Sequence, residues 1–210
     1  MDLATWATFA AASVALLLIP GPTVLMVLSY AIAQGRRVAL ATVAGVALGD
    51  FLAMTASLAG LGALVLASAT LFTILKWAGA LYLVWLGIGM IRGAPAARLG
   101  PLGDVEPAGA AQVFAHAATV TALNPKSIAF FIAFVPQFVT PEAPLVPQFA
   151  VLVSTFVGLA ALNTLAWALL ADGLRRRVAT PALMPVLHRI GGGALIAMGL
   201  VTAFLRRPAT

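Results

Sequence analysis

Long apolar runs constrain the fold of this chain more than any other feature of its sequence. A hydrocarbon core about 30 Å thick needs about 20 apolar residues for each spanning helix, and the sequence supplies several such runs, separated by short polar breaks. A mean hydropathy of +1.08 and 62% hydrophobic residues are typical of a chain that lives in a bilayer. We therefore predict six transmembrane helices, near residues 3–33, 38–67, 70–91, 111–138, 147–171 and 187–205.

These runs are apolar on every face, whereas the strands of a membrane barrel alternate apolar and polar residues. The predicted fold class is therefore all-α, an integral membrane bundle. No basic segment precedes the first run and no small-residue cleavage pattern follows it, so we expect a retained helix. The chain is expected to form one domain over 1–210, with halves 1–92 and 111–210 joined by a cytoplasmic loop over 93–110.

The basic residues predict an orientation in the membrane. The net charge is +6 and the pI is near 11.2, but the arginines gather in particular loops and not along one polar face, which argues against nucleic-acid binding. By the positive-inside rule these loops face the cytoplasm, so both termini of a six-helix chain are expected in the periplasm. The arginines follow the first and third helices or lie between the fifth and sixth: Arg36, Arg37, Arg92, Arg98, Arg175, Arg176, Arg177 and Arg189.

The sequence lacks the residue patterns of a metal site or a cofactor site. It has no cysteine, and His116 and His188 belong to no metal-ligand spacing. It also has no phosphate-binding loop, and the few ionisable residues inside the runs are too poor a set for most membrane-embedded enzymes. We therefore expect no metal, no cofactor and no enzymatic activity, and any solute would move down a gradient or at the expense of one.

Three charged residues lie inside the apolar runs. Lys76 is close to one end of its run, so its stem can reach the headgroups. Asp50 and Lys126 lie near the expected bilayer centre, where a charge costs roughly 2.5–3.5 kcal/mol on insertion scales, so both should face the bundle interior. A fixed ion pair between them would be a structural explanation. Ionisable residues at this depth, however, generally mark a path for ions or substrate, and we favour that interpretation.

Two of the runs carry helix-breaking residues, at 20–22 in the first run and at 124–126 in the fourth. Proline removes an amide donor and clashes with the preceding turn, so the helix must open at both places. Backbone groups freed at membrane depth are tolerated only where protein or a watery cavity satisfies them, so each break predicts a cavity. The residues of the two breaks are Pro20, Gly21 and Pro22, and Asn124, Pro125 and Lys126.

The two breaks occupy matching positions in the two halves of the chain. Gln34 follows Pro22 by twelve residues and Gln137 follows Pro125 by twelve, each at the end of the apolar segment after its break. An odd number of helices in each half would insert the halves with opposite topology, which predicts two inverted three-helix repeats. Paired broken helices of this kind indicate a transporter with its site near the membrane midplane.

Five segments, in order and spacing, resemble the lysine exporter (LysE/RhtB) family of bacterial amino-acid efflux proteins over nearly the whole chain. The resemblance implies six helices, a bacterial inner-membrane location and export of amino acids or close derivatives coupled to the proton motive force. The segments are PGPTVLMV at 20–27, GVALGD at 45–50, LKWAGALYLVWLGIGMI at 75–91, LNPKSIAFFIAFVPQF at 123–138 and RIGGGALIAMGL at 189–200.

With this resemblance added, roles can be predicted for the residues of the breaks. The amides that begin each half-helix are expected to hold the substrate carboxylate, with Lys126 adding charge. Asp50 is expected to take the substrate ammonium in one state and a proton in another, which gives proton antiport. Gly45 and Gly49 should permit close helix packing. The expected substrate-binding residues are Pro20, Gly21, Pro22, Thr23, Asn124, Pro125 and Lys126.

The substrate class follows from the charges inside the runs. A cationic substrate side chain would be helped by a second carboxylate there, and the sequence has none, so a neutral amino acid such as homoserine, threonine or a branched aliphatic one is favoured. The expected partners are this solute, protons and the lipid bilayer, and a homodimer is compatible with the sequence. Two alternatives stay open: a pH-independent uniporter or channel, and a non-transporting scaffold that holds membrane proteins through small-residue faces.

Overall fold

The computed structural model describes residues 1–19, 21–67, 69–96, 108–140, 143–178 and 183–204. Helices make up most of these residues, and no strand occurs among them. The all-α fold class is thereby confirmed. The elements are α1 (Leu3–Leu18), α2 (Pro22–Gln34), α3 (Arg36–Ala67), α4 (Ala69–Gly93), η1 (Ala94–Ala96), α5 (Ala110–Ala122), α6 (Pro125–Ala133), η2 (Val135–Phe138), α7 (Leu145–Val178) and α8 (Leu183–Phe204).

The helices account for up to six membrane spans. Within the described residues, α3, α4, α7 and α8 are each long and apolar enough to cross a membrane. The other two spans are bent pairs: α1 and α2 meet at 58°, and α5 meets the segment Pro125–Phe138 at 46°. Both bends fall at the breaks predicted from proline and glycine. Counting each bent pair as one span gives the six predicted, whereas the inverted repeat stays a prediction.

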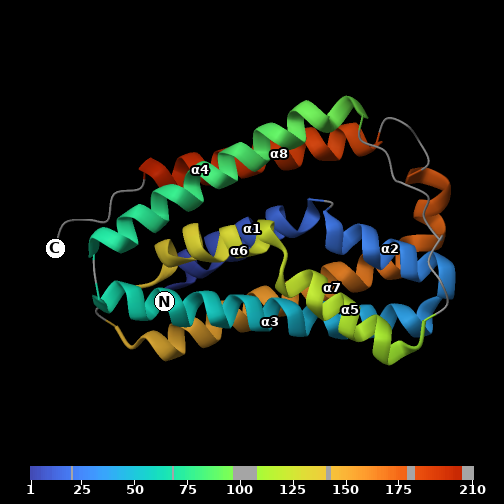
Figure 1. Cartoon of the computed structure of the whole chain (residues 1–210), viewed down its shortest axis with the longest axis horizontal. Helices are drawn as coiled ribbons and strands as arrows, with labels where there is room; N and C mark the ends of the chain where they lie inside the picture. Colours follow the sequence, from blue (N-terminus) through green and yellow to red (C-terminus); the bar gives the residue numbers. More distant parts are fainter. Residues whose placement is uncertain (20, 68, 97–107, 141–142, 179–182, 205–210) are drawn as a thin grey trace.

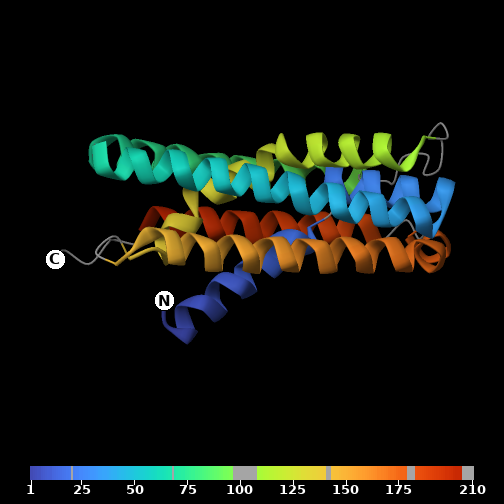
Figure 2. The same cartoon turned by 90° about the horizontal axis from the view of Figure 1, so that it is seen from below.

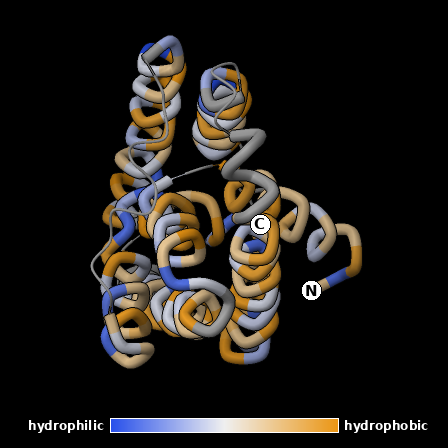
Figure 3. The backbone as a smooth tube through the Cα atoms, turned by 90° about the vertical axis from the view of Figure 1, so that its right-hand side faces the viewer, coloured by the Kyte–Doolittle hydropathy of each residue, from blue (hydrophilic) through white to orange (hydrophobic). Residues whose placement is uncertain are grey.

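The outer surface of the bundle is apolar, as a lipid-facing surface must be. On α4, the side chains of Leu81 and Trp85 are 64% and 66% exposed. Figure 3 shows hydrophobic segments throughout the bundle. Proteins surrounded by water rarely expose an apolar surface this extensive. The structure is therefore that of a multi-pass membrane protein.

The helices form two groups that share the middle of the bundle (Figure 1). One group is the pair α4 and α8, which pack along each other and also contact α1, α3 and α6. The other group is α2, which packs mainly against α3 and α7, and α5, which packs mainly against α3. Figure 2 shows the N-terminal part of α1 leaning away from the other helices. The long helix α3 therefore contacts both groups, and α7 packs against α1, α2 and α3.

Close packing between α3 and α5 depends on two glycines. A Cβ atom built on Gly49 would lie 2.6 Å from the Ala118 carbonyl oxygen, and one built on Gly45 would collide with the Phe114 carbonyl oxygen. Neither neighbour can move independently, because both atoms belong to the backbone of α5. This geometry supports the packing role predicted for Gly45 and Gly49, with the fourth-residue spacing that places both on one face of α3.

Two details differ from the sequence-based expectation. Gln137 does not close the second half-helix, because α6 ends at Ala133 and Gln137 lies in the 3₁₀ turn η2. Pro136 has no amide hydrogen to continue the α-helix, which accounts for the early end. The arginines at 175–177 were expected in a loop but lie in the last turns of α7, and Arg189 lies within α8. They still lie at the end of the bundle where α2, α4 and α7 finish and α3 and α8 begin.

Candidate functional site

A polar layer separates two apolar cores inside the bundle. Along α3, Val46 belongs to a core shared with α2, α5 and α7, whereas Ala53 and Met54 belong to a core shared with α1, α6 and α8. Asp50 lies between these two groups of residues. Contacts bring further polar residues to this level: Asn124 binds Thr23 and the Lys126 amide, Lys126 and Asn163 bind the end of α1, and Thr121 lies beside Gly49. The residues of this polar layer are Thr23, Asp50, Thr121, Asn124, Lys126 and Asn163.

The carbonyl end of α1 is held by donors from two other helices. The ammonium group of Lys126 donates to the carbonyl oxygens of Leu16 at 3.2 Å and Ile19 at 3.0 Å. The Asn163 amide, from α7, donates to the carbonyl oxygen of Leu17 at 3.1 Å. A helix leaves its last carbonyls without intrahelical partners and carries partial negative charge there. Lys126 therefore neutralises the end of α1 that the first break exposes.

The helices that follow the two breaks, α2 and α6, differ at their amide ends. At α6, the Asn124 side chain accepts a hydrogen bond from the Lys126 backbone amide at 3.1 Å, which caps the helix. At α2, the N-cap residue is Gly21, which has no side chain to accept such a bond. The sequence predicts that both amide ends are available to a carboxylate. The structure leaves the end of α2 uncapped, so α2 is the better anion site of the two.

Four of the residues predicted to bind substrate lie together where the two breaks meet. The Asn124 side-chain amide donates to the Thr23 hydroxyl at 3.3 Å, which links the break in the fourth span to the start of α2. A Cβ atom built on Gly21 would lie 3.6 Å from the Lys126 ammonium nitrogen. One cluster thus contains Gly21, Thr23, Asn124 and Lys126.

Pro22 and Pro125 contribute to this site by beginning the half-helices that follow the breaks. Pro22 and Pro125 are the first residues of α2 and α6, where proline is favoured because its missing amide would have no partner. Both are exposed. Pro20 lies outside the described residues.

Asp50 is buried in the centre of α3, with 2% of its surface exposed. In the described part of the chain, no hydrogen bond or ion pair involves its carboxylate. Its charge interacts electrostatically with that of Lys126, but the two groups are not in ion-pair contact. The fixed ion pair considered as a structural explanation is therefore not formed in this conformation, and the Asp50 carboxylate has no hydrogen-bonding partner among those residues.

Asn163 is a functional candidate that the sequence did not predict. It is a polar position in the fifth run, and its contact with α1 depends on how the spans pack, which the sequence alone does not give. A single amide inside an apolar run is a usable signal, because a buried polar side chain needs a partner. His116, which belongs to no metal-ligand spacing, shares a hydrogen bond of 2.9 Å with the Tyr30 hydroxyl. Among the described residues, no group of His, Asp and Glu has the arrangement of a metal site.

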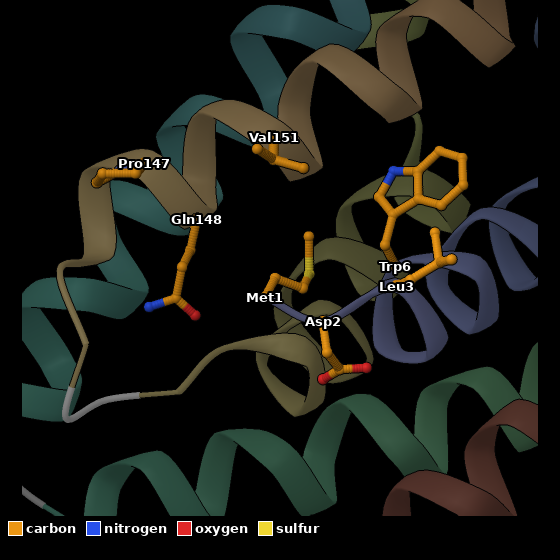
Figure 4. A pocket seen from close by; sticks show the side chains of 7 residues that line it. All are labelled: Met1, Asp2, Leu3, Trp6, Pro147, Gln148 and Val151. Carbon is orange, nitrogen blue, oxygen red and sulfur yellow. The ribbon is translucent and has the colours of Figure 1, made fainter.

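A cavity of about 370 Å³ lies away from the breaks, between the starts of α1 and α7 (Figure 4). Its polar groups are already engaged: Asp2 accepts from Thr5, and the Gln148 amide binds the backbone of the preceding loop. It is therefore less suited to bind a solute than the polar layer. The lining residues are Met1, Asp2, Leu3, Trp6, Pro147, Gln148 and Val151.

The contact of Lys126 with α1 leads to a prediction about stability. Lys126→Ala should lower the free energy of unfolding by about 1–3 kcal/mol, because two buried carbonyls lose a charged donor. For a chain of this size, each kcal/mol corresponds to about 2–4 °C in Tm. Thermal unfolding of the purified protein in detergent measures the change. Lys76→Ala is the control, and equal losses in the two variants would contradict a special role for the α1 contact.

These features define a class of protein. Broken spans whose interrupted backbones meet in a polar layer, with a buried carboxylate and an ammonium group inside it, are the construction of a membrane transporter. Comparison with known sequences identifies the particular family. The chain belongs to the LysE type translocator family, whose sequence profile matches residues 14–205. The family resemblance read from the motifs is thereby confirmed.

Relatives match over most of the chain. It is 33% identical over 201 residues to the homoserine/homoserine lactone efflux protein of Salmonella typhimurium, covering 96% of this chain and 97% of the relative. A membrane protein of Vibrio cholerae is 32% identical over 203 residues, covering 97% and 98%. The leucine efflux protein of Klebsiella pneumoniae is 34% identical over 137 residues, covering 65% and 64%. No solved structure matches the chain.

Proposed function

We propose that the protein exports amino acids or close derivatives from the cytoplasm in exchange for protons. The observation that carries this proposal is the meeting of the two helix breaks around Lys126. Membership of a translocator family and the efflux proteins among the relatives support it. A gradient must supply the driving force, because the sequence has no nucleotide-binding loop.

The polar layer is chemically complementary to a zwitterion. The uncapped amides at the start of α2 favour a carboxylate, and the adjacent ammonium of Lys126 adds positive charge. The buried Asp50 carboxylate offers the negative charge that a substrate ammonium requires. Asp50 takes that ammonium in one state and a proton in the other. The two cations exclude each other at this carboxylate, so solute leaves as a proton enters.

The arginine distribution supports a location and an orientation. The arginine-rich end of the bundle faces the cytoplasm of a bacterial inner membrane by the positive-inside rule. The start of α1 and the end of α8 both lie toward the opposite end (Figure 1), so both termini are periplasmic.

A neutral amino acid is the favoured substrate. Asp50 is the one acidic residue in the sequence of the candidate spans, which leaves no second carboxylate for a cationic side chain. The relatives named for homoserine and leucine handle solutes without a charged side chain. Homoserine lactone has an amine but no carboxylate, so the ammonium is the charged group that it shares with homoserine.

An efflux panel tests the proposal. Cells that express the protein are loaded with labelled homoserine, threonine, leucine, lysine and arginine, and efflux is measured with and without an uncoupler. We expect faster efflux of one or more neutral solutes than from cells without the protein, and loss of that difference with the uncoupler. Efflux that resists the uncoupler would favour the uniporter or channel, and preferred efflux of arginine would contradict the neutral substrate. If no solute moves although the protein is in the membrane, the export proposal fails.

A further inference from the structure

We infer that the carbonyl end of α1 is the subsite for the ammonium group of the exported solute, and that Lys126 occupies this subsite in the present conformation. The carbonyl end of α1 here means the backbone oxygens of Leu16, Leu17 and Ile19. The inference rests on the proposed function and specifies where one end of the substrate binds. It also gives Lys126 a second role besides holding a carboxylate.

The geometry is that of an ammonium site. Two carbonyl oxygens of α1 accept from the Lys126 ammonium at 3.0 and 3.2 Å, and the third accepts from Asn163. The carbonyl ends of broken helices bind cations in transporters because the helix dipole and the freed oxygens act together. A primary ammonium has three N–H donors and no acceptor. The substrate's ammonium and the side chain of Lys126 therefore present the same chemistry to these oxygens.

Asp50 provides independent support for a cation at this place. Only 2% of its surface is exposed. Among the described residues, no hydrogen bond involves its carboxylate. Within the described part of the chain, the charged group that acts on it is Lys126. A buried carboxylate requires a compensating charge. If Lys126 moved away with no replacement, Asp50 would lose that compensation, whereas an arriving ammonium would restore it.

The position of Gly21 explains how the exchange would favour an amino acid. The Lys126 ammonium lies beside Gly21, which begins the uncapped amide end of α2. An amino acid whose ammonium binds the end of α1 and whose carboxylate binds the start of α2 would bridge the first break. The displaced Lys126 would remain next to Gly21 and meet that carboxylate. Lys126 would thus bind the end of α1 in the empty protein and the substrate carboxylate in the loaded one. N-acetylated amino acids lack the ammonium that replaces Lys126 on α1, so they would not be exported.

The test uses ethylammonium chloride as a probe on the full-length protein in detergent. In Lys126→Ala the subsite is vacant, and ethylammonium should raise Tm by about 2–4 °C. Wild type and Lys76→Ala should show a clearly smaller rise at each ethylammonium concentration, because ethylammonium must first displace Lys126 from the subsite in both. Tetramethylammonium carries the same charge but no N–H donor, so it should have no effect on Lys126→Ala. Equal rises in all three proteins, or none in Lys126→Ala, would overturn the inference.

Competition connects this cation site to the substrate. Homoserine should shift the ethylammonium response of Lys126→Ala to higher ethylammonium concentrations. A response that homoserine leaves unchanged would show a cation site unrelated to substrate and overturn the inference. The proposed function fails separately, through the absence of efflux in the wild type, which the ethylammonium response does not measure.

A second measurement serves if Lys126→Ala does not fold. In the wild type, ethylammonium should displace Lys126 and increase its rate of acetylation several-fold, with Lys76 in the same molecules as the reference. Mass spectrometry of the digested protein gives both rates. An unchanged ratio of the two rates over the ethylammonium titration would count against the inference.

Discussion

Asp50→Asn is expected to reduce uncoupler-sensitive efflux to the level of cells without the protein. The substitution keeps the size of the side chain but removes the group that can exchange a proton for a substrate ammonium. It also leaves Lys126 without the charge that acts on it. Since the carboxylate forms no hydrogen bond among the described residues, its amide replacement breaks none of the contacts seen there. Export should therefore fail in a protein that still inserts.

Initial efflux rates, measured at equal amounts of membrane-inserted protein, test this expectation. Asp2→Asn is a matched control, because Asp2 caps α1 outside the bundle core and asparagine caps a helix equally well. The control should export at the wild-type rate. Proton-driven export by Asp50→Asn at that rate would show that another group couples protons, with Lys126 the first to examine.

The broken spans could be predicted because proline and glycine act locally. A proline inside an apolar run removes an amide whatever surrounds it, so the positions of both breaks followed from the residues at 20–22 and 124–126. The need to bury charge likewise predicted that Asp50 faces the interior, where the structure has it. In both cases the free-energy cost depends on the residue and on the bilayer, and not on which neighbour the residue contacts.

The partners within the polar layer could not be predicted in the same way. Lys126 was expected to serve a substrate carboxylate, yet its ammonium donates to Leu16 and Ile19, more than 100 residues earlier in the chain. The sequence shows which group is charged but not which freed carbonyl comes within reach, since that depends on how the spans pack. The partner of Asn163 could not be predicted for the same reason. The early end of α6 could not be predicted either, because the length of the turn around Pro136 depends on how that turn packs.

Gly49→Val is expected to prevent accumulation of folded protein, the largest effect on stability that we predict. A Cβ atom at this position would lie 2.6 Å from the Ala118 carbonyl oxygen and 2.7 Å from the Cβ of Thr121. Overpacking of a tight interface costs about 1–3 kcal/mol and sometimes more, and two further methyl groups make the clash worse. Because Asp50 is the next residue, any separation of α3 from α5 also displaces the carboxylate proposed to couple protons.

Gly158→Val separates this steric effect from the general cost of valine in a helix. Nothing lies within 4 Å of a Cβ atom built on Gly158, although both glycines are inside long helices. We expect Gly158→Val to accumulate at nearly the wild-type level, as judged by fluorescence-detected size-exclusion chromatography of detergent extracts. Gly49→Val should lose most of the monodisperse peak. Equal recovery of the two variants would show that α3 and α5 can separate without cost, and would remove the reason for a glycine beside Asp50.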